Sequence, residues 1–92
     1  MILSFGDKVT EQLWATERSS RFGSVARVAL RKLLQLHAAA RLGDLAVPPG
    51  NRLEALSGRR KGQHSIRIND QWRICFCWTS NGPEDVTICD YH

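Results

Sequence analysis

The strongest constraint on the fold is a change in hydrophobic periodicity at Pro48 and Pro49. Before these prolines, apolar residues recur at steps of three and four, which is typical of helices with one buried face. After them, apolar and polar residues alternate, which is typical of antiparallel strands. Helices followed by strands indicate an α+β fold, with the helices covering one face of the sheet. The prolines, with Gly43 and Gly50, also predict a loop over residues 42–51.

The first half of the chain is expected to hold a short edge strand and two helices. Residues 1–5 are apolar and suit the strand. A helix is expected over residues 7–16 with Asp7 as its N-cap. A longer helix is expected over residues 24–40 with Ser24 as its N-cap. All 92 residues then form one small domain.

An antiparallel meander of about four strands is expected after the loop. The expected strands cover residues 52–56, 63–68, 72–79 and 86–89. Alternation divides the third strand into a core face and an opposite face. Trp72, Ile74, Phe76 and Trp78 share the first, and Arg73, Cys75, Cys77 and Thr79 share the second.

The register of the first hairpin follows from matching core residues across neighbouring strands. A three-residue turn over residues 69–71 places Ile66 opposite Ile74 and Arg67 opposite Arg73. Like charges opposed on one sheet face are destabilising by up to about 1 kcal/mol. The arginine pair therefore favours an anion held between the two guanidinium groups. The alternatives are that both side chains reach solvent, or that a tyrosine and a carboxylate relieve the repulsion.

For the last hairpin we expect a five-residue connection over residues 80–84. It places Thr79 opposite Asp85, Trp78 opposite Val86, Phe76 opposite Ile88, Cys75 opposite Cys89, Arg73 opposite Tyr91 and Trp72 opposite His92. The end of the chain would then continue the last strand beside the face that carries Arg67 and Arg73.

Positive charge is concentrated in the middle of the chain. The whole chain has a net charge of +4, and residues 52–73 alone contribute +4 from six basic and two acidic side chains. The basic residues of this stretch are Arg52, Arg59, Arg60, Lys61, Arg67 and Arg73. A compact basic stretch attracts polyanions such as RNA. The alternative is a basic face that only contacts solvent.

Three cysteines, Cys75, Cys77 and Cys89, are too few and odd in number for a disulfide scaffold. The chain also has no long apolar run that would span a membrane and no signal peptide at its N-terminus. These features predict a cytoplasmic protein with no metal or cofactor and with cysteines that are small buried side chains. The alternative is a Cys₃His zinc site with His64 or His92, although ligands on a regular strand do not converge.

The last three residues, Asp90, Tyr91 and His92, hold the candidate chemistry. Imidazole transfers protons near neutral pH, and tyrosine stacks on nucleotide bases. Arginine stabilises the charge that builds on a phosphate during transfer. Beside Arg67 and Arg73, these groups suit cleavage of RNA through its own 2′-hydroxyl, which needs no metal. The alternative is a frayed terminal tail.

Four segments carry a more specific pattern. They are residues 2–5, 53–62, 65–76 and 90–92. In these segments, and in the order of its elements, the chain resembles the HigB-type toxins of the RelE/ParE superfamily. The most specific feature is the Trp72-Arg73-Ile74 strand combined with the terminal Asp90-Tyr91-His92.

The resemblance implies a RelE-like, microbial-RNase-like fold and a toxin of a type II toxin–antitoxin system. Such a toxin cleaves mRNA in the decoding site of the ribosome. It is neutralised by a HigA-like antitoxin with a helix-turn-helix domain, through which alone the complex binds operator DNA. Two alternatives are a superfamily toxin that acts by binding, as gyrase poisons do, and a plain RNA-binding module.

The resemblance also implies roles for individual residues. Arg73 matches the arginine that stabilises the scissile phosphate, and Asp90, Tyr91 and His92 match the catalytic terminus. We expect an exposed Arg73 that contributes little to packing, and RNA contacts from Arg59, Arg60, Lys61 and Arg67.

Glu54 departs from the family pattern, because some relatives have a proton-transferring histidine there. A glutamate acts as a base only where burial or a neighbour makes it more basic. It is therefore the secondary candidate for proton transfer, after His92. The alternative is a structural acid paired with Arg52 or Arg59.

Overall fold

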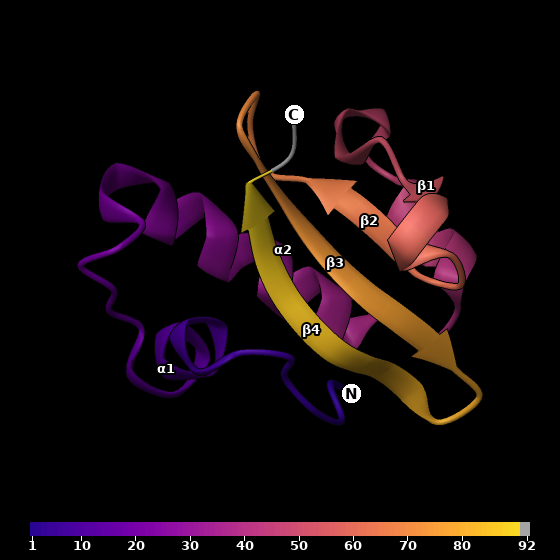
Figure 1. Ribbon diagram of the computed structural model, residues 1–92, viewed down its shortest axis with the longest axis horizontal. Coiled ribbons are helices and arrows are strands. Elements are labelled where there is room, and N and C mark those ends of the chain that lie inside the picture. Colours follow the sequence, from indigo (N-terminus) through magenta and orange to yellow (C-terminus); the bar gives the residue numbers. More distant parts are fainter. Residues whose placement is uncertain (91–92) are drawn as a thin grey trace.

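The computed structural model, which describes residues 1–90, confirms the α+β fold (Figure 1). Two helices, α1 (Lys8–Thr16) and α2 (Ala26–Ala38), precede a four-stranded antiparallel sheet. The strands are β1 (Glu54–Ala55), β2 (His64–Arg67), β3 (Trp72–Thr79) and β4 (Gly82–Asp90), and they lie in chain order. Within these residues, no helix is long and apolar enough to cross a bilayer.

The two helices begin in different ways. The Asp7 carboxylate accepts a hydrogen bond from the Thr10 N–H at 2.8 Å, which confirms Asp7 as the N-cap of α1. The expected N-cap at Ser24 is wrong, because the chain enters α2 through a 3₁₀ turn over Gly23–Val25. Ser24 lies inside that turn and its side chain caps no helix.

The free edge of β4 is covered by the N-terminal segment. Residues 1–6 run parallel to β4, but they form only one bridge, between Phe5 and Val86, instead of the expected strand. The Gly6 N–H donates to the Val86 carbonyl at 2.9 Å, and the Ile88 N–H donates to Thr10 Oγ1 at 3.0 Å. These contacts occupy edge groups that would otherwise be open to pairing with another chain.

One face of the sheet packs on the helices, and α2 passes behind the strands in Figure 1. The fully buried side chains of this apolar cluster come from the helices, the sheet and the turn over residues 42–46: Leu13, Ala29, Leu33, Leu36, Leu45, Ile66, Ile74, Phe76 and Val86. The three tryptophans pack against this cluster but are only partly buried. The core face predicted for β3 is therefore confirmed, with its tryptophans at the margin.

The loop expected over residues 42–51 contains two 3₁₀ turns, Leu42–Ala46 and Pro49–Asn51. Asn51 is fully buried and joins the second turn to α2. Its amide donates to the Leu45 carbonyl and to Gln35 Oε1, both at 3.1 Å, and its Oδ1 accepts from Lys32. This buried network, in which the Asn51 side chain is fully hydrogen-bonded, fixes the loop that connects α2 to the sheet.

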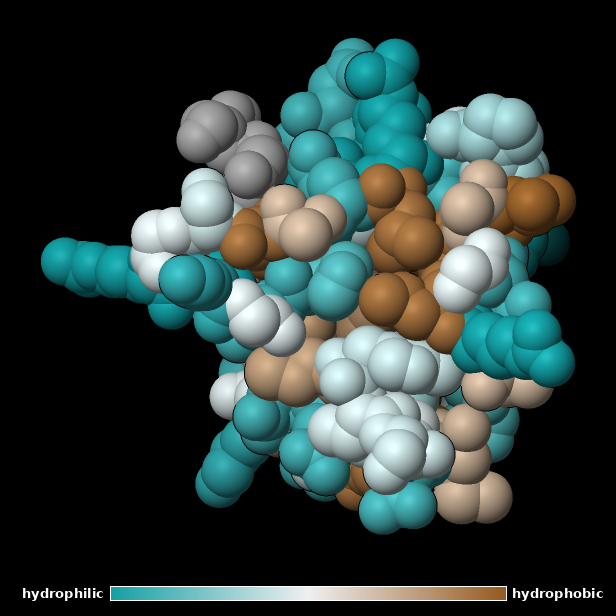
Figure 2. All heavy atoms as spheres, turned by 90° about the vertical axis from the view of Figure 1, so that its right-hand side faces the viewer, coloured by the Kyte–Doolittle hydropathy of each residue, from teal (hydrophilic) through white to brown (hydrophobic). Residues whose placement is uncertain are grey.

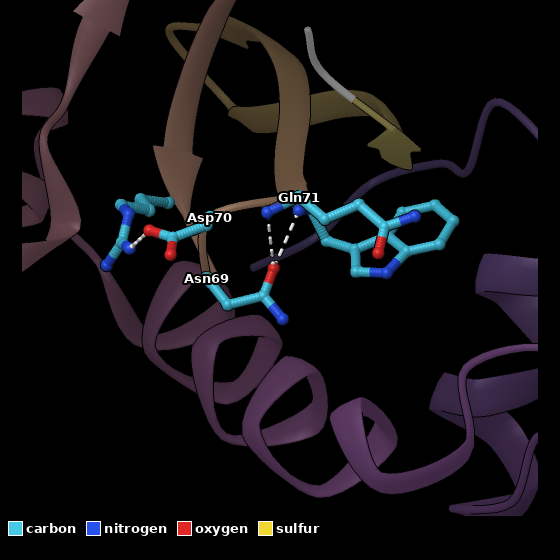
Figure 3. A network of polar contacts seen from close by, with 5 residues as sticks. Asn69, Asp70 and Gln71 are labelled. Atoms are coloured by element: carbon cyan, nitrogen blue, oxygen red, sulfur yellow. Dashed lines mark hydrogen bonds and ion pairs between the residues drawn. The ribbon is translucent and has the colours of Figure 1, made fainter.

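The β2–β3 hairpin has the expected register. Ile66 pairs with Ile74, and Arg67 pairs with Arg73. Figure 3 shows how the turn is held: Asn69 Oδ1 accepts from the N–H groups of Gln71 at 2.9 Å and of the following tryptophan at 2.7 Å. Asparagine favours such turns because its side chain bonds the backbone two residues on.

The expected register of the β3–β4 hairpin is wrong, by two residues from Trp72 to Cys75 and by three residues next to the turn. Trp72 pairs with Asp90, Arg73 with Cys89, Ile74 with Ile88 and Cys75 with Thr87, while Thr79 pairs with Gly82. The turn is shorter than expected, and a bulge between Cys75 and Cys77 absorbs one further residue. From Trp72 to Cys75, the shift of two keeps the side chains on their expected faces.

Gly82 is required at the start of β4. Its φ is 134°, which other residues rarely adopt, and an added Cβ would lie 2.4 Å from the Met1 carbonyl oxygen.

Candidate functional site

The sheet face opposite the helices carries two rows of side chains that run across the strands. Glu54, Ser65, Cys75 and Thr87 form one row, and Arg67, Arg73 and Cys89 form the other. The rows are neighbours, so residues in one contact residues in the other along the diagonal.

Arg73 is buried within this face, with 7% of its surface exposed, so the expectation of an exposed side chain is wrong. Its Nε donates to Ser65 Oγ at 2.8 Å, and its Nη2 donates to the Arg52 carbonyl at 2.7 Å. Arg52 is in the left-handed region, with φ 47°. The guanidinium is therefore held by fixed acceptors on β2 and on the segment between the Pro49–Asn51 turn and β1, which restricts its motion.

Glu54 contacts this guanidinium. Its Oε1 lies 3.1 Å from Nη2 of Arg73, and about half of the Glu54 side chain (49%) is exposed. The partners expected for a structural acid were Arg52 or Arg59, and the structure gives Arg73 instead. The reason is the β1–β2 register, because Glu54 pairs with Ser65, the residue that also holds Arg73.

Arg67 and Arg73 do face each other, and carboxylates relieve their repulsion. Asp70, in the β2–β3 turn, forms an ion pair with Arg67 (Figure 3), and Glu54 pairs with Arg73. The carboxylate part of the alternative therefore holds, whereas its tyrosine part falls on Tyr91, outside the described residues; with both charges paired, the like-charge pair by itself no longer argues for a bound anion. Each arginine of the register pair has its own acidic partner.

A groove of about 380 Å³ lies beside the Arg73 row. It is lined by Gly6, Asp7, Arg60, Gln63, Asp85, Thr87, Ile88, Cys89 and Asp90. Cys89, the register partner of Arg73, connects the groove to the arginine. Arg60 reaches the groove from the turn before β2, and its Nη1 donates to Gln63 Oε1 at 3.2 Å.

The basic turn Arg59, Arg60 and Lys61 is exposed and follows Gly58, which has φ 63°. Of these three side chains, only Arg60 lines the groove. Arg67 lies on the far side of Arg73 from the groove, one strand away. The predicted RNA contacts are therefore spread over two sides of Arg73.

Asp90 ends β4, opposite Trp72. It is exposed, lines the groove, and accepts a hydrogen bond from Gln71 Nε2 at 3.1 Å. The structure thus brings Asp90 and Arg60 to the same groove, but the register places Asp90 with Trp72 on the sheet face opposite to the one that carries Arg73. The predictions for Tyr91 and His92 fall outside the described residues.

Two groups that hold Arg73 were not predicted from the sequence: the Ser65 hydroxyl and the Arg52 carbonyl. The contact with Ser65 could have been predicted, because the Arg67–Arg73 register places Ser65 on the same face, two residues from Arg67. The contact with the Arg52 carbonyl could not have been predicted, since no local sequence motif specifies a left-handed conformation at an arginine. Among residues 1–90, no three histidine, cysteine or acidic side chains are grouped as a metal site.

Comparison with known proteins places this arrangement in a family. Residues 3–92 match a family model described as the RelE-like toxin of type II toxin–antitoxin system HigB. Toxin HigB-1 of Vibrio cholerae is 44% identical over 100% of this chain and 98% of its own length. An uncharacterized protein of Haemophilus influenzae is 36% identical over 67% of this chain and 61% of its own length.

A solved structure supports the fold. The YoeB–YefM complex from Staphylococcus aureus includes a chain that matches with a TM-score of 0.58. The two chains are 17% identical, and the match covers 100% of this chain and 98% of the other. Family model, full-length relative and fold agree: the chain belongs to the HigB family of RelE-like toxins of type II toxin–antitoxin systems, which act in pairs with an antitoxin.

Proposed function

We propose that this toxin is a ribosome-dependent mRNA endonuclease that cleaves through the RNA 2′-hydroxyl. The observation that carries the proposal is the Arg73 guanidinium, held by Ser65, Arg52 and Glu54 beside a groove lined by Arg60 and Asp90. A preorganised cation stabilises developing charge without reorganising during the reaction. Such an arginine suits a transition state in which charge builds on a phosphate.

The proposed reaction needs a base, an acid and this cation. A base takes the proton from the 2′-hydroxyl, whose oxygen attacks the adjacent phosphorus. Arg73 stabilises the charged oxygens of the phosphorane, and an acid donates a proton to the departing 5′-oxygen. We assign the main proton transfer to His92 and the stacking or orientation of the cut nucleotide to Tyr91. Asp90 belongs to the same terminus.

Glu54 takes a supporting role in this scheme. The Glu54 carboxylate forms an ion pair with the Arg73 guanidinium. As a general base, it would have to act beside the same cation that it pairs with. We therefore propose that Glu54 orients Arg73, with proton transfer as its secondary role.

The basic turn would hold RNA on the groove side. Arg59, Arg60 and Lys61 are exposed and carry no carboxylate partner among the ion pairs of residues 1–90. Contacts to phosphates fix position and make binding depend on salt. Arg67, whose charge is paired with Asp70, would add a weaker contact. A ribosomal substrate also requires the toxin to act in the cytoplasm.

For the antitoxin, we propose a HigA-like helix-turn-helix protein, through which the complex would reach operator DNA. Figure 2 shows apolar side chains gathered at the middle of the side of the molecule that is on the right in Figure 1, with hydrophilic side chains around them. Among residues 1–90, the large apolar side chains left exposed are Met1, Leu3, Leu34 and Val47. Exposed apolar surface of this kind is typical of protein interfaces.

The test is cleavage of mRNA on ribosomes, with mapping of the product ends. We expect cuts that require ribosomes, with a 5′-hydroxyl on one product and a 2′,3′-cyclic or 3′-phosphate on the other. His92→Ala should lower the rate by about 10²–10⁴, the usual contribution of one general acid or base. An mRNA with a 2′-deoxynucleotide at the cut position is the matched control and should stay intact. Products with a 5′-phosphate, or equal cutting by the variant, would contradict the proposal.

A further inference from the structure

Another cavity lies at the C-terminal end of α1 and shares no lining residue with the groove. Its volume is about 390 Å³. One face of α1 and the connection that follows this helix line the cavity, with the residues Val9, Gln12, Thr16, Arg18, Ser19, Ser20 and Arg21. In Figure 1, this connection lies at the left edge of the molecule, whereas β1 lies on the right. The cavity is therefore separate from the groove and lies away from the basic turn that follows β1.

The lining of this cavity contains two arginines and no carboxylate. Neither Arg18 nor Arg21 belongs to an ion pair among residues 1–90. Glu17 is next to Arg18 in the sequence, but it is outside the lining. The groove differs, because three aspartates and one arginine line it. Positive potential in the cavity is thus not offset by its own lining, which favours an anion.

The two pairs of arginines can be compared directly. Arg67 and Arg73 face each other on the sheet, and a carboxylate relieves the charge of each. Arg18 and Arg21 share a cavity, and no acidic side chain of residues 1–90 forms an ion pair with either of them. An anion bound between these two guanidinium groups would take the place of the carboxylates that relieve the other pair.

The fold fixes both ends of the segment that carries the two arginines. At one end, Thr16 Oγ1 on α1 accepts a hydrogen bond from the Arg18 N–H at 3.3 Å. At the other end, Phe22 is buried in the core, and its ring meets the Trp72 ring edge-on with the ring centroids 5.3 Å apart. A site that is held in place before binding loses less conformational entropy when the ligand arrives.

Two serines add hydrogen-bond donors to the charge. Within the part of the chain that the structure describes, the hydroxyls of Ser19 and Ser20 and the guanidinium groups of both arginines donate to no protein group. Guanidinium and hydroxyl groups are common donors to phosphate oxygens. The volume is near the lower end of the range for small-ligand sites, so a phosphate with its sugar fits. A helix of a partner protein, about 10 Å across, is too wide.

We propose that this cavity is a phosphate-binding site, in which Arg18 and Arg21 neutralise the phosphate and Ser19 and Ser20 donate hydrogen bonds to its oxygens. The phosphate belongs to an RNA backbone or to a free nucleotide, which present the same chemistry to the site. The proposal concerns binding alone and does not depend on how, or whether, the toxin cleaves RNA.

The first test follows the backbone amide signals of the full chain by two-dimensional NMR. One titration uses uridine monophosphate, and the other uses a 2′-O-methyl hexauridylate, which has no 2′-hydroxyl to attack the phosphate. We expect the amide signals of residues 18–21 to shift with at least one of them. A shift with the hexauridylate alone, at equal concentration of phosphate groups, identifies the RNA backbone as the source. A shift at least as large with the monophosphate identifies a free nucleotide. No shift with either would overturn the proposal.

Sodium acetate at the same ionic strength is the control for the class of anion. Acetate should leave the signals of residues 18–21 in place, because a carboxylate offers fewer oxygens to the donors of the cavity. Equal shifts with acetate and with the phosphate ligands would overturn the proposal, since the cavity would then suit a carboxylate of a partner protein.

The second test compares two double variants that lose the same charge. Arg18→Gln with Arg21→Gln removes the proposed site, whereas Arg31→Gln with Arg41→Gln changes exposed arginines outside both cavities. Loss of one phosphate contact lowers the slope of log K against log salt by about 0.7, which is about fivefold weaker binding at about 0.1 M salt. We expect this loss in the first variant for the ligand that shifts the signals. Equal losses in both variants would show that net charge alone determines binding and would refute the site.

Discussion

Arg67 and Arg73 face each other on one sheet face, yet they are in opposite surroundings. Arg73 is buried and bound by a hydroxyl, a backbone carbonyl and a carboxylate. Within residues 1–90, Arg67 forms an ion pair with Asp70, whose side chain is fully exposed in a turn. The same residue type therefore serves two purposes: the buried arginine is a fixed part of the sheet, and the other is a partly exposed charge paired with the turn.

The largest effect should come from Arg73→Ala. It removes the proposed charge stabiliser, so we expect the cleavage rate to fall by a factor of about 10²–10³. It also leaves the buried Ser65 hydroxyl without its partner, so we expect the free energy of unfolding to fall by about 2–3 kcal/mol. Cleavage on programmed ribosomes and thermal unfolding by circular dichroism check the two parts separately. An unfolding midpoint equal to that of the natural chain would show that the buried contacts are unimportant.

Ser65→Ala should have the next largest effect. It keeps Arg73 but removes the acceptor of the Nε hydrogen bond, which is worth about 1–3 kcal/mol for a charged donor. We expect about tenfold slower cleavage, because the guanidinium loses one of its fixed contacts. Ser80→Ala, in the exposed β3–β4 turn, is the control and should behave as the natural chain does. Equal cleavage rates in both variants would remove Ser65 from the site.

Glu54→Gln tests whether the carboxylate orients Arg73 or transfers a proton. Because half of Glu54 is exposed, the change in stability should be small. An orienting role predicts a loss of about tenfold or less, smaller than the loss in His92→Ala. A loss that matches or exceeds the one in His92→Ala would make Glu54 the main proton-transfer group.

Arg67→Ala should have the smallest effect. The repulsion between the arginines is already relieved by Asp70 and Glu54, so removing Arg67 should leave the unfolding midpoint unchanged. Binding to RNA should weaken and depend less on salt, because one cation is lost. Titration of RNA at two salt concentrations measures this. An unfolding midpoint clearly above that of the natural chain would mean that the repulsion persists.

The two hairpins show how much of the fold the sequence determines. In β2–β3, core residues match in only one way and Asn69 specifies a short turn, so the register could be predicted. In β3–β4, two registers that differ by two residues both bury apolar side chains. The bulge beside Asp85, which has φ 53°, decides between them, and it depends on contacts with the N-terminal segment.

The candidate site likewise has features that could be predicted from the sequence and features that could not. Arg73 and its face could be predicted from alternation, and so could the proximity of Ser65. The burial of Arg73 could not, because it depends on where β1 and the left-handed Arg52 pack against β2. The groove beside Cys89 likewise combines segments from both ends of the chain, Gly6 and Asp90.

The proposed function depends most on Arg73, which stabilises the transition state as a fixed guanidinium. Arg73→Lys tests it most directly, since lysine keeps the charge but cannot make the same set of hydrogen bonds. The measurement is the single-turnover cleavage rate on programmed ribosomes. Circular dichroism determines the folded fraction of each variant, so that rates are compared per folded molecule. We predict a folded variant that cleaves at least about 100-fold more slowly. A rate within about twofold of the natural chain would contradict the claim.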